Sequence, residues 1–154
     1  MTARLSIVFA LLLAFALGGA AHAQGMSAQC SVTEFHATND KKGVDPKLDK
    51  LKALLSSPPF KAWDSFALLS DNSVTIERQK PTQVKLVRGT LTLLYKDKLI
   101  EEGGKARVRV GVDLDDAGGK RVLSTVLVFG SPTSLGGTPY KGGNHFLYLG
   151  CSAQ

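Results

Sequence analysis

Two cysteines at opposite ends of the chain constrain its fold more than any other feature. The chain has 154 residues, and its two cysteines are Cys30 and Cys151. A disulfide between them would require their Cα atoms to lie within about 7 Å of each other. The first and last segments of the folded chain would then be neighbours. This pairing is the expected one where the chain reaches an oxidising compartment.

The N-terminus has the features of a secretory signal. Arg4 supplies a positive charge, residues 5–17 are almost wholly apolar, and the small-residue motif Ala21-His22-Ala23 follows. We therefore expect residues 1–23 to be a signal peptide that is removed on export. The apolar run is shorter than the roughly 20 residues of a membrane-spanning helix, so we expect no transmembrane segment. The predicted location is the periplasm or the extracellular space.

Export makes the disulfide the default state of the two cysteines. A metal site or a reactive thiol pair is the alternative, but the sequence has no CxxC motif and no Cys/His cluster. Lipidation of Cys30 would need a small-residue box directly before it, at the end of the apolar run. Cys30 instead follows Ser27-Ala28-Gln29, well beyond that run. We predict the Cys30–Cys151 disulfide.

Residues 24–154 have the pattern of a single β-rich domain. Cys30–Ala37 alternates and is rich in β-forming residues, and the clearest strand, residues 106–114, places its valines on one face. Residues 121–130, "RVLSTVLVFG", are nearly continuously apolar, which is typical of a strand covered on both faces. Turn signals recur about every ten residues, and Asp71-Asn72 is interpreted as one of them.

One short helix is predicted near the start of the domain. Asp45 has the character of an N-cap, and Pro46 suits the first helical position. Leucines then recur at helical spacing until the "SSPP" motif, so we predict an amphipathic helix from Pro46 to Ser56. The predicted fold class is mainly β (α+β). It is an antiparallel β-sandwich or barrel of about seven or eight strands, with this short N-terminal helix across one opening.

Four segments carry a resemblance to a known group of proteins. They are the strand end "FHAT", the helix "DPKLDKLKALL", the entry to the sheet "PFKAWDSFALLS" and the closing segment "LGGTPYKGGNHFLYLGC". In their order they resemble a family of small exported bacterial proteins. The resemblance implies an exported, mainly β domain, and it implies no reaction and no catalytic residues. The two cysteines depart from the family's general pattern.

Two histidines are the candidates for chemistry in the mature chain. His36 and His145 would lie on the terminal strands that the cysteines bring together, and Glu34 would share a strand face with His36. A zinc site would need further ligands beside the two histidines. The competing interpretation is a pair of surface or strand-end histidines without a catalytic role. We assign no catalytic and no metal-binding residue from the sequence.

Basic residues on the predicted sheet form a second candidate site. The whole chain has a formal net charge of +6. If several cations share one face, they would attract an anionic glycan or lipid surface. The alternative is a solvated polar face that prevents edge-to-edge pairing of strands. The possible anion-binding residues are Lys85, Arg107, Arg109, Lys120 and Arg121.

These features predict a non-catalytic exported β domain that binds or supports an envelope component. The partner would be an envelope protein, a glycan or an anionic lipid surface, held through the sheet surface or an edge strand, and no cofactor is expected. Nucleic acid is not an expected partner, because the basic residues do not alternate with aromatic ones. The alternative is a small secreted hydrolase or metal-dependent enzyme with a site near His36 and His145.

Overall fold

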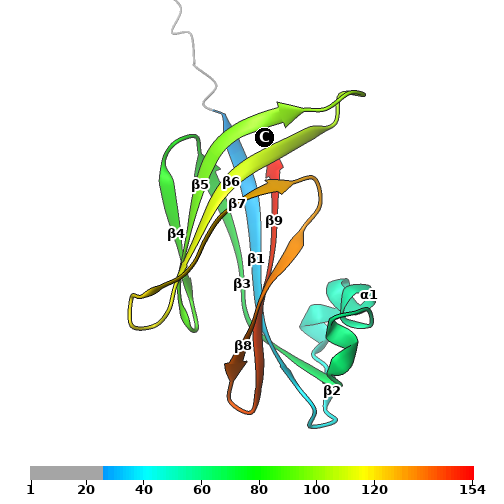
Figure 1. Cartoon of the computed structure of the whole chain (residues 1–154). Helices are drawn as coiled ribbons and strands as arrows, with labels where there is room; N and C mark the ends of the chain where they lie inside the picture. Colours follow the sequence, from blue (N-terminus) through cyan, green and yellow to red (C-terminus); the bar gives the residue numbers. More distant parts are fainter. Residues whose placement is uncertain (1–25) are drawn as a thin grey trace, which may run out of the picture.

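The computed structural model describes residues 26–154, and the predicted signal peptide, residues 1–23, lies outside the described residues. In the described part, nine strands and three short helical segments follow one another along the chain (Figure 1). No helix in residues 26–154 is long and apolar enough to cross a membrane. The elements are β1 (Ser27–Thr38), β2 (Gly43–Val44), η1 (Pro46–Leu51), α1 (Lys52–Leu55), η2 (Phe60–Ala62), β3 (Ser65–Glu77), β4 (Pro81–Leu86), β5 (Gly89–Ile100), β6 (Ala106–Asp115), β7 (Arg121–Phe129), β8 (Thr133–Tyr140) and β9 (Gly143–Ala153).

The strands form two sheets that face each other. Sheet A has the strand order β2-β3-β1-β9-β8, and sheet B has the order β4-β5-β6-β7. Neighbouring strands are antiparallel, apart from the two-residue strand β2, which runs parallel to β3. The prediction of a mainly β, antiparallel, sandwich-like domain with little helix is confirmed.

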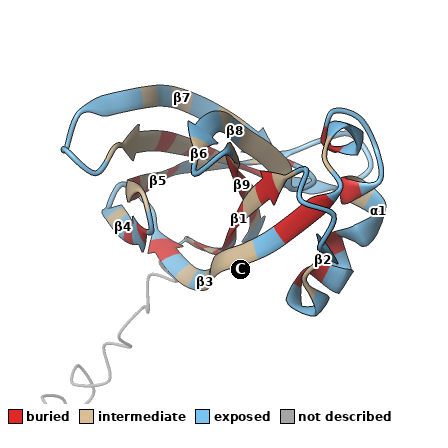
Figure 2. Ribbon diagram, turned by 90° about the horizontal axis from the view of Figure 1, so that it is seen from below, coloured by how far each residue is buried: buried red, intermediate tan, exposed pale blue. Residues whose placement is uncertain are grey.

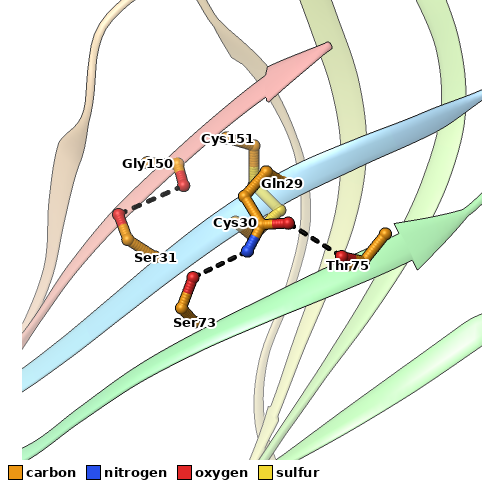
Figure 3. Close-up of a disulfide and its surroundings, with 7 residues drawn as sticks. All are labelled: Gln29, Cys30, Ser31, Ser73, Thr75, Gly150 and Cys151. Atoms are coloured by element: carbon orange, nitrogen blue, oxygen red, sulfur yellow. Dashed lines mark hydrogen bonds between the residues drawn. A yellow bond between two sulfur atoms is a disulfide. The ribbon is translucent and has the colours of Figure 1, made fainter. Parts of the chain in front are cut away.

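The first and last strands lie side by side at the centre of sheet A. Cys30 on β1 is the register partner of Cys151 on β9, and the two form the predicted disulfide with a Cα–Cα distance of 4.1 Å. Figure 3 shows the polar side chains around this bond. Gln29 donates to Ser73 and accepts from Thr75, each at 2.7 Å, which joins β1 to β3. The disulfide joins β1 to β9 and the Gln29 hydrogen bonds join β1 to β3, so β1 is held to both of its neighbours in this region.

Strand β1 contributes side chains to two separate cores. Cys30 and Val32 point between the two sheets, whereas Phe35 and Ala37 lie on the other face, under the helical segments. Figure 2 shows buried residues both on β1 and β9 and at the helical end of the molecule. The second core is aromatic: the rings of Phe35 and Phe146 stack at 5.6 Å between centroids. The strand predicted for residues 30–37 is present, but its burial does not alternate throughout, because residues 32–35 are all buried where both faces of β1 are covered.

The helical region differs from the single predicted helix of residues 46–56. Asp45 caps it as expected, accepting a hydrogen bond from the Lys47 amide at 2.9 Å. The segment then divides into η1, a 3₁₀ helix, and α1. Leu48 and Leu51 are three residues apart and Leu51 and Leu55 four apart, and all three are buried. A 3₁₀ turn aligns the first pair and an α turn the second, so packing against the aromatic core explains the division.

Two further predictions about the strands were wrong. Asp71-Asn72 is not a turn, because β3 passes through it; Thr33 and Lys50 donate to the two carboxylate oxygens of Asp71 at 2.7 and 2.8 Å. These tertiary contacts offset the local turn preference. Strand β7 is not covered on both faces, because its outer valines are exposed. It also lies at the edge of sheet B.

Removal of the disulfide should destabilise the domain strongly. The bond joins residues 121 positions apart, and the chain-entropy model gives about 4–5 kcal/mol for a loop of that length. We expect the variant with Cys30→Ala and Cys151→Ala to lose about 3–5 kcal/mol in the free energy of unfolding, measured in urea. Reductant should weaken the wild-type chain and leave the variant unchanged. Equal stability of oxidised and reduced wild-type chain would contradict this prediction.

Candidate functional site

A carboxylate, Glu34, lies fully buried where the core between the sheets ends. His145 Nε2 donates to its Oε1 at 2.7 Å. Its other oxygen accepts from Ser70 Oγ at 2.8 Å and from the Val87 amide at 2.9 Å. Glu34 has no exposed surface and His145 is 5% exposed. These partners come from β9, β3 and the β4–β5 turn, so one carboxylate on β1 connects three separate parts of the chain.

The environment keeps this buried carboxylate ionised. Burial by itself raises the pKa of Glu34, but the hydrogen bonds from His145, Val87 and Ser70 together outweigh it and leave the pKa below its usual 4.5. Both carboxylate oxygens have donors, which is the condition under which a buried charge is tolerated. The ionised Glu34 carboxylate therefore connects β1 with β3, β9 and the β4–β5 turn through its hydrogen bonds.

The two histidines are adjacent, as predicted, but they face different partners. His36 and His145 are register partners on β1 and β9. Nε2 of His36 forms a hydrogen bond with the Tyr140 carbonyl oxygen at 2.8 Å, whereas His145 binds Glu34. His145 lies near the start of β9 but is not a surface side chain, because it is 5% exposed and hydrogen-bonded to Glu34. Within residues 26–154 no three His, Cys, Asp or Glu side chains are grouped to hold a metal ion.

Two cations that are not among the predicted anion-binding residues, Arg88 and Lys141, lie over the ring of Tyr140. The guanidinium of Arg88 lies 5.1 Å from the centre of its ring and Nζ of Lys141 lies 5.2 Å from it. Arg88 also donates to the Pro139 carbonyl at 2.8 Å, which connects the β4–β5 turn with the end of β8. A hollow of about 350 Å³ beside His36 and Lys141 contains one carboxylate, Asp40, and Lys42 pairs with it at 2.7 Å. The arrangement is a set of cation–π and hydrogen-bond contacts that close this end of the fold.

The glycine-rich closing segment is a hairpin with close backbone contacts. Gly136 has φ +118°, and a Cβ there would lie 2.8 Å from the His145 carbonyl oxygen. A Cβ on Gly143 would lie 2.1 Å from the Ala37 carbonyl oxygen. These glycines let β8 and β1 approach β9 closely, and they explain the glycine content of the segment without a bound ligand.

The arginines among the predicted anion-binding residues have carboxylate partners. Arg107 pairs with Glu101 at 3.0 Å, and Arg109 with Asp97 at 3.3 Å. Arg121 pairs with Asp113 at 2.8 Å and also with Asp115. Lys85 lines a hollow together with Asp115 and Asp116; Lys120 donates its backbone amide to Asp116 at 2.9 Å. The charges of the three arginines are therefore offset by neighbouring carboxylates.

Strand β7 is the least protected sheet edge in the described part of the chain. The other edges have features that oppose pairing with a further strand. β2 has two residues and leaves most of β3 open, but β3 carries Asp71 and Glu77 and has a register shift against β1. β4 is short and begins with Pro81, and β8 contains Gly136, Gly137 and Pro139 with a register shift against β9. β7 has nine residues, and after Arg121 it has no charge, glycine or proline.

The outer face of β7 is mostly apolar. Val122, Val126 and Val128 are 52%, 48% and 44% exposed. Every second residue of β7 lies on this exposed face, so the three valines share it with Ser124, which separates Val122 from Val126. Figure 2 shows that much of β7 is exposed. The apolar run of residues 121–130 is the sequence feature that corresponds to this edge. The prediction of a strand covered on both faces is wrong because the outer face of β7 is exposed.

Comparison of the chain with protein-family models, curated proteins and solved structures gives no match.

Replacement of Glu34 should change how stability depends on pH. The pKa of Glu34 in the folded state lies below the usual 4.5, so its contribution is present above pH 4.5 and is lost as pH falls below that value. Glu34→Gln should cost about 1–3 kcal/mol at pH 7, because it removes buried hydrogen bonds to a charge. The difference between wild type and variant should shrink on acidification.

The measurement is the free energy of urea unfolding between pH 3 and pH 7, and Glu102→Gln in the exposed β5–β6 turn is the matched control. The control should follow the wild type at every pH. A Glu34→Gln variant that loses the same stability at pH 3 as at pH 7 would show that the charge of Glu34 does not stabilise the fold.

Proposed function

We propose that the chain is a non-catalytic exported docking domain that receives an extended polypeptide segment along β7. The observation that carries the proposal is the contrast between β7 and the other sheet edges of the described residues. β7 is nine residues long and mostly apolar on its outer face, whereas β2, β4 and β8 are short or carry proline, glycine or a register shift. Unprotected edges of this kind are rare in proteins that have no use for them.

Strand addition is the mode of binding that suits such an edge. The free side of β7 presents backbone N–H and C=O groups, which give affinity to an added strand, and its alternating side chains give specificity. Residues 122–129 carry no charge. A charged segment would lose its hydration against the outer valines without gaining a partner. The proposed occupant is therefore an uncharged segment with alternating, β-branched apolar side chains.

The other candidate functions receive less support from the geometry. An anion-binding sheet surface would need an excess of free cations, and Arg107, Arg109 and Arg121 each lie beside carboxylates. An enzyme site at the histidines would need an accessible reactive group, and the hydrogen-bonded side chains of Glu34 and His145 are buried. The predicted signal peptide is the reason for assigning the docking to the cell envelope or the exterior.

Binding of a synthetic strand tests the proposal. The probe is a fluorescent peptide with the sequence of residues 121–129, "RVLSTVLVF", carrying two added lysines for solubility, and the readout is fluorescence anisotropy with the exported chain. We expect saturable binding. A peptide with the same composition in scrambled order should bind at least tenfold more weakly, since its side chains no longer alternate.

Backbone methylation of the peptide distinguishes strand addition from nonspecific hydrophobic binding. In an antiparallel pair, the amides of alternate residues face the partner strand. One peptide is N-methylated at its even-numbered positions and a second at its odd-numbered positions. One of the two should lose binding and the other should retain it. Equal binding of both methylated peptides, or no saturable binding of the parent peptide, would overturn the proposed function.

A further inference from the structure

We infer that the polypeptide which occupies β7 is β7 of a second copy of this chain, paired with it antiparallel about a two-fold axis. The inference rests on the proposed function, since it requires that the β7 edge accepts a strand. It goes further by naming the partner and the register of the pairing.

The sequence of β7 is nearly self-complementary. In a two-fold antiparallel pair centred on Thr125, Val122 lies opposite Val128 of the second copy, and Leu123 lies opposite its Leu127. Thr125 meets its own counterpart, and the one unlike pair inside the strand is Ser124 with Val126. A Thr–Thr pair across two strands stabilises a sheet, and the like apolar pairs remove each other's surface from water, so a second copy of the strand is a matched partner.

The length of β7 and the alternation of its side chains determine this register. β7 runs from Arg121 to Phe129, and its midpoint is Thr125, so full overlap of two copies requires this centre. A shift by one residue would place inward-facing Leu123 of one copy beside an outward-facing valine of the other. The period of two in a strand makes such a shift unfavourable when the two faces differ.

The charges near β7 are compatible with a second copy. The only charged residue of the strand, Arg121, lies at its end and is held by Asp113 and Asp115 of its own sheet. The interior of the pairing would then contain no charge, and the two +1 groups would lie at opposite ends of it. Charge therefore does not oppose the association in the way that central edge lysines would.

The pairing would also limit the assembly to two copies. The four strands of sheet B in each copy would form one continuous sheet of eight, whose outer edges are the two β4 strands. β4 begins with Pro81, carries Lys85 and has six residues, which opposes addition of a further strand. A two-fold interface with protected outer edges gives a dimer rather than a filament.

Charged variants of the outer valines test the inference. In the proposed register, the variant with Val122→Lys and Val128→Lys places lysines opposite lysines, and the variant with Val122→Glu and Val128→Glu places glutamates opposite glutamates. Both positions are about half exposed, so the folds should persist, which circular dichroism checks. By analytical ultracentrifugation we expect a wild-type dimer, two variants that each dimerise at least tenfold more weakly, and a restored dimer when the two variants are mixed.

Ile100→Lys is the matched control, because Ile100 is exposed by 72% and lies at the end of β5, which β6 separates from β7. This variant should dimerise as the wild type does. A dimer that persists in both charged variants, or a mixture that does not associate, would overturn the inference. So would a wild-type chain that remains monomeric while it binds the β7 peptide. In that last case the docking function would stand and the partner would be a segment of another protein.

A single cysteine reports the register. Thr125→Cys should form a covalent dimer under mild oxidation, because the two positions lie opposite each other, as Cys30 and Cys151 do within the chain. Ser124→Cys should crosslink far less, since in this register its counterpart lies diagonally. Mass spectrometry shows whether the Cys30–Cys151 bond stays intact. Equal crosslinking at both positions, or stronger crosslinking at Ser124→Cys, would contradict the register.

Discussion

The pairing of β1 with β9 is the constraint on which the rest of the structure depends. It runs from the partners Ala28 and Ala153 to Ala37 and Asn144 and contains the Cys30–Cys151 disulfide. Both cores are built on these two strands, the sheet-to-sheet core on one face and the aromatic core on the other. The disulfide holds one end of the pair, and the Glu34–His145 hydrogen bond holds it near the opposite end. Because the bonds are far apart along the strands, they keep the register over most of the length of the pair.

Much of the pairing of β1 with β9 could be predicted from the sequence. The disulfide follows from export and from the positions of two cysteines, and the proximity of His36 to His145 follows from the disulfide. The alternation in β1 and β9 correctly separates the residues of the two cores, for example Phe146 from Leu147. These predictions succeed because the period of a strand and the geometry of a disulfide are local rules.

What the sequence could not supply depends on contacts between distant segments. Glu34 and Val87 are 53 positions apart, and no local pattern indicates that a turn amide reaches the carboxylate. The apolar run of β7 has the same appearance whether a strand is covered on both faces or lies at an edge with one face open. The choice depends on strand order, which places β7 last in sheet B. The 3₁₀ character of η1 likewise results from packing of Leu48 and Leu51 on the aromatic core.

The structure thus separates its stabilising features from its candidate binding surface. The disulfide lies within sheet A, and the buried Glu34 carboxylate joins sheet A to the β4–β5 turn, whereas β7 at the opposite edge of sheet B has neither of these restraints. Its protection from uncontrolled pairing would come from a specific partner rather than from charge or proline. Amide hydrogen exchange of the wild-type chain at low and high protein concentration tests this claim most directly. The account predicts that alternate β7 amides become protected as concentration rises, while those of the β4 and β8 edges do not change. Exchange in β7 that stays fast at all concentrations would contradict the pairing of β7 with β7 of a second copy.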